Sequence, residues 1–223
     1  MKLSKITDWL DSTLKVQSFS DVSNNGLQID RSGGDVKCVA FAVDASARAM
    51  EMAAKAGAQL LVVHHGISWG GGIQRINGGV YRVVKTAMDA NLALYACHLP
   101  LDANKPLGNN WQLAKFFGLR RIKPAFTYHG NVIGVIGENR HGRKIGICSG
   151  GAGEFAETAK MLGCDLFVTG EASWGDVIAA ENCGIEMICA GHYETEVFGV
   201  RAVASAMKRA LKIKTIDLTE KLR

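Results

Sequence analysis

A stretch of the first half of the chain recurs in the second half, and this repeat constrains the fold more than any other feature. The segment KCVAFAVDASARAMEMAAKAGAQLLVVHH aligns without gaps with RKIGICSGGAGEFAETAKMLGCDLFVTGE, and Gly57 meets Gly163 at an offset of 106 (163 − 57). Each copy has the pattern of a strand, a helix and a second strand. A chance likeness is the alternative, because any two βαβ units share this patterning.

A second repeated element carries polar residues and favours duplication over chance. NLALYACHLPLD lies against IEMICAGHYETE, so that His98 meets His192 and Asp102 meets Glu196, both at an offset of 94 (192 − 98 and 196 − 102). In each half, the tripeptide SWG lies between the long repeated segment and this His-x-x-x-acid element, at 68–70 and at 173–175. The same His-x-x-x-acid element therefore follows an apolar strand in each half.

The apolar periodicity predicts an α/β fold. Helices are expected over Leu3–Leu14, Ala45–Ala56 and Val80–Asn91, and strands over Cys38–Val43, Leu60–Val63 and Leu92–Cys97. This alternation predicts two similar lobes with mixed sheets flanked by helices, as pseudo-symmetric halves around a shared metal cleft. We expect one domain over 1–223, with lobe 1 over about 1–125 and lobe 2 over about 126–223.

The composition indicates a globular protein of the cytoplasm. Hydrophobic residues make up 48% of the chain, yet the longest apolar segments are far shorter than the roughly 20 residues of a membrane span. The N-terminus has acidic residues where a signal peptide would be apolar. A net charge of +5 suits a small anionic substrate, but it is too weak to indicate nucleic acid.

The six cysteines lack CxxC spacing and lie mostly in apolar runs. We therefore interpret them as small core residues in a reducing compartment. A role as soft metal ligands stays open for Cys97 and Cys189, which lie near the candidate site in the sequence.

Five polar residues that follow strands predict a metal site. They are His64, His65, Asp102, His192 and Glu196. Ligands in open α/β sheets bind beyond the carboxyl ends of strands, and imidazole with carboxylate suits Zn, Mn or Fe. Five protein ligands exceed what one catalytic ion usually takes, which favours two divalent ions. The alternatives are a buried, hydrogen-bonded histidine pair and acids that merely begin helices.

Two further residues are candidates for proton transfer. Glu171 is equivalent in the repeat to His65, and it could be a general base or orient a ligand histidine. His98 could be a sixth ligand, a proton carrier or a hydrogen-bond donor beside the site. The turn over 149–153 could hold an anion on its backbone N–H groups, or it could be a plain strand-to-helix turn. Trp69 is expected at a mobile lip or an interface.

The remaining charged segments are expected to be solvated. His129 and His141 lie in polar stretches, and the basic segments Arg120–Lys123 and Arg140–Lys144 have the composition of exposed faces or loops.

The motifs taken in order resemble one family. They are SNNGLQID, LLVVHHG, YACHLPLDA followed by LGNNWQLA, SGGAG, LFVTGE and AGHYETE. From about Asn24 to about Val203 the chain resembles the Nif-three-like family, whose bacterial members are labelled GTP cyclohydrolase 1 type 2 homologues. The span from Gly118 to Arg143 is too short for the domain that many members carry there, so the chain resembles the short form.

The resemblance implies a two-lobed protein with a dinuclear metal centre, held by the same five residues as above. It also implies a toroidal homohexamer, a trimer of dimers with its metal sites facing the interior. Asn25, Gly26 and Gln28 match the family's NGLQ segment, which is expected as a structured loop near the site.

Two functions are compatible with these expectations. The first is a metal-dependent hydrolase of a small phosphorylated or nucleotide-like substrate, in which Asp102 and Glu196 bridge the ions. His64, His65 and His192 would then be terminal ligands. The alternative is a non-catalytic metal-handling or regulatory ring protein.

Overall fold

The computed structural model describes residues 1–222, which form alternating strands and helices. The helices are α1 (Leu3–Leu14), α2 (Ala47–Lys55), α3 (Gly78–Asp89), α4 (Leu99–Ala103), α5 (Asn109–Phe116), α6 (Ala156–Met161), α7 (Trp174–Cys183), α8 (His192–Leu211) and α9 (Thr219–Leu222), with 3₁₀ turns η1 (Val16–Ser18) and η2 (Gly153–Phe155). The strands are β1 (Gly26–Ile29), β2 (Cys38–Asp44), β3 (Leu60–His65), β4 (Ala93–Ala96), β5 (Arg120–Tyr128), β6 (Asn131–Glu138), β7 (Lys144–Gly151), β8 (Leu166–Glu171), β9 (Glu186–Cys189) and β10 (Lys214–Asp217).

The chain divides into two compact units. Unit 1 comprises Met1–Leu101 together with the described residues from Val200 onward, and unit 2 comprises Asp102–Gly199. These limits differ from the lobes expected over about 1–125 and 126–223. The division differs because α5 packs on the second sheet, whereas the C-terminal strand β10 pairs with β2 in the first sheet.

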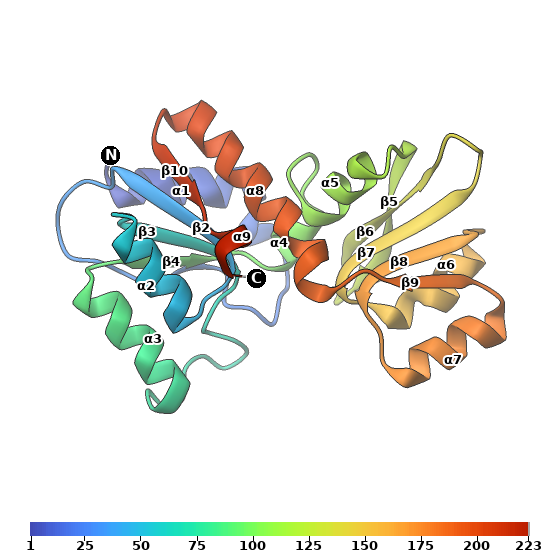
Figure 1. The fold of residues 1–223 in the computed structure, drawn as a ribbon, viewed down its shortest axis with the longest axis horizontal. Helices are drawn as coiled ribbons and strands as arrows, with labels where there is room; N and C mark the ends of the chain where they lie inside the picture. The colour runs from blue at the N-terminus through green and yellow to red at the C-terminus, as the bar shows by residue number, and fades with distance from the viewer. Residues whose placement is uncertain (223) are drawn as a thin grey trace. The chain divides into compact units, whose positions relative to one another are not determined.

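Unit 1 contains a five-stranded mixed sheet in the order β1-β4-β3-β2-β10. Strands β10, β2, β3 and β4 are parallel, and β1 is antiparallel to β4 at one edge. Figure 1 shows α2 and α3 on one side of this sheet and α1 on the other. Because β2, β3 and β4 are covered on both faces, nearly all of their residues are buried, as is usual for parallel strands.

The alternation of side chains along each strand accounts for the two buried faces of the first sheet. Ala49, Met50 and Ala53 of α2 pack in one apolar cluster with the alternate sheet residues Leu61 and Leu94. Alternation along a strand sends the intervening residues to the other face. There the hydroxyl of Tyr95 donates a hydrogen bond to Asp11 of α1, which fixes α1 against that face.

Unit 2 contains a second five-stranded mixed sheet, in the order β5-β6-β7-β8-β9. Strands β7, β8 and β9 are parallel, while β5–β6 and β6–β7 are antiparallel. The parallel trio β7-β8-β9 thus matches the trio β2-β3-β4 of unit 1, as the sequence repeat predicts. The expected α/β class with two mixed sheets flanked by helices is confirmed.

Helices cover both faces of the second sheet. Trp111 and Leu113 of α5 pack with Val135 and Ile147 on one face. Figure 1 shows α6 and α7 on the opposite side. On that side the ring of Phe167 lies 5.3 Å from the ring of Phe126, measured between centroids. No helix among residues 1–222 is long and apolar enough to span a membrane.

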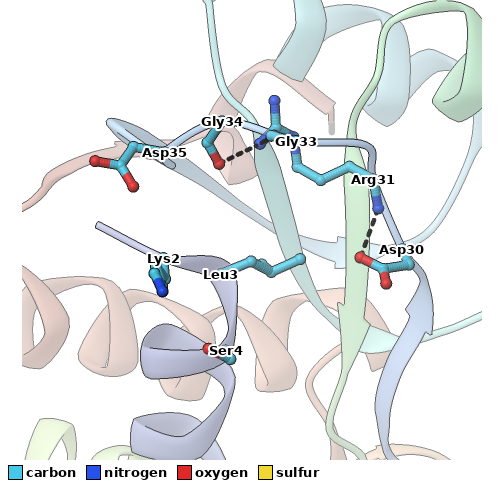
Figure 2. Close-up of a pocket in the computed structure, with 8 residues that line it drawn as sticks. All are labelled: Lys2, Leu3, Ser4, Asp30, Arg31, Gly33, Gly34 and Asp35. Carbon is cyan, nitrogen blue, oxygen red and sulfur yellow. Dashed lines mark hydrogen bonds between the residues drawn. The ribbon is translucent and has the colours of Figure 1, made fainter.

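A hollow of about 510 Å³ lies at the N-terminus of α1 in unit 1 (Figure 2). Two of its charged side chains have partners: the guanidinium of Arg31 donates to the carbonyls of Gly33 and Gly34, and Asp35 pairs with the N-terminal amine at 3.3 Å. The described lining residues include none of the candidate metal ligands. The candidate site therefore lies elsewhere in the fold.

Candidate metal site

Three histidines converge at the carboxyl end of the first sheet. His64 and His65 are the last residues of β3, and His98 follows β4. One ligand nitrogen from each of the three lies within 4.8 Å of the others, so the group could hold a metal ion. The two adjacent histidines address the same region because the strand ends at His65.

Each of the three imidazoles is held through its Nδ1 atom. His64 Nδ1–H donates to the carbonyl of Cys97 at 3.0 Å, His65 to Asp44 at 2.8 Å and His98 to Asp21 at 2.9 Å. Such a bond fixes the neutral tautomer with the lone pair on Nε2. A carbonyl or carboxylate behind each ring is the usual arrangement for metal-ligating histidines, because it orients the ring and raises its basicity.

Asp21, which the sequence did not indicate as a site residue, holds the ring of His98. Its carboxylate accepts hydrogen bonds from His98, the Leu99 and Ser23 amides and the Asn25 side chain, at 2.8–3.0 Å. Burial raises the pKa of Asp21, but the bonds from His98 and Asn25 outweigh it and lower the pKa to about 2. Asp21 is therefore an anion at neutral pH and a positioning residue for His98.

Asp44 was not predicted either, although its position after a strand could have indicated it. It ends β2 directly beside His65 in the parallel register, so its carboxylate meets that imidazole. A polar residue at the carboxyl end of the neighbouring strand was the available signal. By contrast, Asp21 lies 77 residues from His98 in the chain, and no local pattern connects them.

The NGLQ segment supports the histidines, although it is partly a strand rather than the expected loop. Gly26 begins β1, while the Asn25 side chain accepts from the His98 amide at 2.8 Å. Gln28 accepts from the amide of Ile67 at 2.7 Å, in the turn after His65. The expectation that this segment lies near the candidate site is met within unit 1.

Trp69 lies beside the histidine cluster. Its ring centroid is 5.1 Å from that of His98 and 6.1 Å from that of His65. The indole N–H donates to the carbonyl of Gly66 at 3.0 Å, which anchors the ring. The tryptophan ring therefore borders the histidine cluster on one side.

Unit 2 brings together the other candidate ligands at the end of its own sheet. His192 Nε2 lies 3.2 Å from a carboxylate oxygen of Glu196, one turn later in α8. Its Nδ1 lies 2.9 Å from Glu171, the last residue of β8. The hydrogen bond to Glu196, with a smaller contribution from Glu171, raises the pKa of His192 to about 9.

Glu171 therefore has the geometry of an orienting residue. It holds His192 through Nδ1 as Asp44 holds His65. Of the two roles left open by the sequence, this contact favours the orienting role over that of a general base.

Asp102 lies next to Glu196 within unit 2. A carboxylate oxygen of Asp102 and one of Glu196 lie within 4.8 Å of each other, and both side chains are buried. Asn109 and Ser149 donate to one oxygen of Asp102, at 2.8 and 3.1 Å. Two buried carboxylates this close repel each other, and a cation between them would relieve that repulsion.

The backbone at Gly150 leaves space for a ligand in front of these side chains. A Cβ atom at this position would lie 2.5 Å from a carboxylate oxygen of Glu196 and 3.2 Å from His192 Nε2. Gly150 also has a φ of +69°, which side chains rarely adopt. The donor set and this cradle both fit a divalent cation of the Zn, Mn or Fe type.

Three backbone amides of the glycine turn over 149–153 have side-chain partners. Ser149, Gly150 and Ala152 donate their amides to Asn110, Thr195 and Thr169 within unit 2. Because these N–H groups already have partners, the anion-binding alternative does not apply to them. The helix that follows, α6, begins at Ala156.

None of the possible ligand groups found among residues 1–222 includes a cysteine. Cys97 is buried, and burial together with nearby carboxylates raises the pKa of Cys148 well above its usual value. Cys183 is half-buried and Cys189 is exposed, so the expectation of core residues is wrong for Cys189. Strand β9 is the edge of its sheet, which leaves Cys189 uncovered.

As expected, His129 and His141 are exposed.

Fold and site together define the class: a two-sheet α/β protein with clusters of histidine and carboxylate able to hold a metal ion. The profile of the Duf34/NIF3 (NGG1p interacting factor 3) family matches residues 1–141 and 128–221. The chain belongs to this family.

Individual relatives agree with this assignment. The chain is 36% identical to a GTP cyclohydrolase 1 type 2 homolog of Pyrococcus horikoshii, over 97% of both chains. It is 38% identical to the homolog of Deinococcus radiodurans, over 92% of this chain and 88% of that protein. A solved structure from Thermus thermophilus superimposes with a TM-score of 0.85 at 29% identity and covers 98% of both chains.

Proposed function

We propose that this chain binds two divalent metal ions and hydrolyses a small phosphorylated or nucleotide-like substrate. The observation that carries the proposal is the set of three histidines whose Nδ1 atoms are each held by an acceptor. Such rings present neutral Nε2 atoms, which is the form that binds a metal. The Asp102–Glu196 pair in unit 2 supplies the carboxylates.

The proposed ligands are His64, His65, Asp102, His192 and Glu196, with His98 as a further ligand or proton carrier. Asp102 and Glu196 would bridge the ions. Chain connectivity supports a common centre for both groups, because only three residues separate His98 from Asp102. The acidic and imidazole donors suit Zn, Mn or Fe.

The proposed chemistry divides between the ions and the protein. Bound divalent ions would lower the pKa of a coordinated water and polarise the scissile bond of the substrate. Asp21 and Asp44 keep their histidines in a fixed tautomer and orientation, and Glu171 orients the ring of His192. His98, held by Asp21 through Nδ1, can accept a proton at Nε2 when it is not a ligand.

The names of the relatives support the proposed substrate class. Several relatives carry the name GTP cyclohydrolase 1 type 2 homolog, which favours a nucleotide-like substrate. A homohexameric ring belongs to the same proposal and would be checked by light scattering of the purified chain.

The test is metal analysis of the purified chain, followed by a hydrolysis screen on nucleotides and phosphate esters with Mn, Zn, Fe or Mg added. We expect about two ions per chain and turnover that is lost with the ions in His64→Ala. His129→Ala is the matched control, because that histidine is exposed and distant in the sequence from the cluster.

Each outcome has a definite meaning. Turnover retained by a metal-free His64→Ala protein would refute the hydrolase mechanism. Two ions per chain without turnover on any substrate would instead favour the metal-handling or regulatory alternative. Absence of bound metal under every condition would refute both.

A further inference from the structure

Two basic segments that are far apart in the sequence meet on the second sheet. The antiparallel register places Arg120 opposite Glu138, and Glu138 opposite Lys144. The start of β5 and the start of β7 therefore lie on either side of the end of β6. Between them is a hollow of about 240 Å³, lined by Arg121, Lys123, Ile136, Gly137, Glu138 and Lys144.

The hollow is cationic. Its lining has three cations and one carboxylate, and that carboxylate, Glu138, is paired with Arg121 at 3.0 Å. Lys144 donates to the carbonyl of Leu162 at the end of α6. The side chain of Lys123 is exposed and has no ion-pair or hydrogen-bond partner among residues 1–222. At least one cation of the lining is therefore uncompensated.

The backbone is irregular where it borders this hollow. The pairing of β5 with β6 shifts register between Arg120 and Lys123, and Arg121 has a φ of +52°. An arginine in the left-handed region is strained, and a bulge redirects the side chains beside it. Strain of this kind is retained mainly where a particular side-chain direction is needed. Here both side chains flanking Ile122 line the hollow.

We propose that this hollow is a phosphate-binding subsite for the oligophosphate group of a small ligand. Arginine and lysine are the usual partners of phosphate oxygens, as a planar fork and as a point charge respectively. The volume of about 240 Å³ is below the roughly 300–1,000 Å³ that encloses a whole small molecule, so the hollow suits the charged group alone. None of the described residues that line the subsite is a proposed metal ligand.

The experiment is calorimetric titration of the full chain with inorganic tripolyphosphate in a phosphate-free buffer. We expect binding that weakens as salt rises, because the contact is electrostatic. The variant Lys123→Gln should bind about tenfold more weakly, and Lys123→Gln with Lys144→Gln more weakly still. Lys55→Gln, an exposed lysine at the end of α2, is the matched control and should bind like the wild type.

Lys123→Gln carries the test even if loss of Lys144 disturbs α6, because the Lys123 side chain is exposed. Tripolyphosphate held by ions at the metal centre would not respond to Lys123→Gln, so unchanged affinity in that variant would overturn the subsite. Absence of tripolyphosphate binding to the wild type would overturn it as well. A parallel titration with a single-stranded oligonucleotide distinguishes the source: binding of the oligonucleotide alone would overturn the small-ligand assignment.

Discussion

Substitution of Asp21 by asparagine tests how the histidine cluster is held. The asparagine keeps the shape of the side chain but removes its charge, and its amide nitrogen cannot accept a hydrogen bond. In the native chain the two carboxylate oxygens accept four bonds, from His98, Leu99, Ser23 and Asn25. The substitution therefore leaves donors facing a donor inside unit 1.

The expected loss of stability follows from these contacts. Hydrogen bonds to a charged acceptor contribute roughly 1.5–3 kcal/mol each, and an unsatisfied buried donor costs about 1–3 kcal/mol. The loss should therefore be about 2–3 kcal/mol at pH 7. Part of it is electrostatic: the fall in the pKa of Asp21 from 3.8 to about 2 corresponds to about 1–2 kcal/mol after allowance for solvent screening.

The assay is chemical denaturation of metal-free protein, followed by circular dichroism, for wild type and Asp21→Asn. Because the pKa is lower in the folded state, the electrostatic part is fully present above pH 3.8 and is lost as the pH falls through about 2. The difference between the two proteins should therefore narrow between pH 4 and pH 2.

The control is Asp35→Asn, which removes an exposed carboxylate paired with the N-terminal amine. Exposed pairs of this kind contribute about 0–1 kcal/mol. An Asp21→Asn protein within about 0.5 kcal/mol of wild type at pH 7 would refute the assigned role of Asp21.

Three other perturbations have defined outcomes. Gly150→Ala would place a Cβ 2.5 Å from Glu196 at a positive φ, so it should lower both metal content and the unfolding midpoint; unchanged metal content would argue against the cradle. Zn²⁺ titration at pH 7.5 in two buffers of different ionisation enthalpy should reveal release of about one proton, because the pKa of His192 is raised to about 9; no release would exclude His192 as a ligand. Ser173→Ala removes a capping box from α7 and should cost about 1 kcal/mol by thermal unfolding, without effect on metal content.

Much of the fold was predictable because it depends on local patterns. Helix α1 has the predicted bounds, and β2 and β3 extend the predicted strands by one and two residues to Asp44 and His65. Helix α1 is buried on one face and the strands are buried along their length, so the spacing of their apolar residues indicates which kind of element each one forms. The repeat also predicted the matching parallel trios of strands.

Other parts depend on contacts between distant residues. Strand β10 is four residues long, with only partial burial, and its sequence KTID has no distinctive pattern. Its place beside β2 decides the limits of unit 1, which is why the predicted lobe boundary near residue 125 differs from the observed division. In the candidate site, the residue type and the position after a strand indicated the histidines. Asp21 could not be predicted in this way, because it is 77 residues from His98 and only the tertiary fold brings the two together.

Unit 1 is built from two separate segments of the chain, and this affects its folding during translation. Unit 2 is a continuous segment, so all of its strands have been synthesised once residue 199 is added. The first sheet lacks its β10 edge until Asp217 has emerged, although β2 is made early. During translation β2 therefore presents an open hydrogen-bonding edge, and such edges pair readily with other chains. A truncation before Lys214 would make that exposure permanent, so stop codons late in the gene should yield aggregating products.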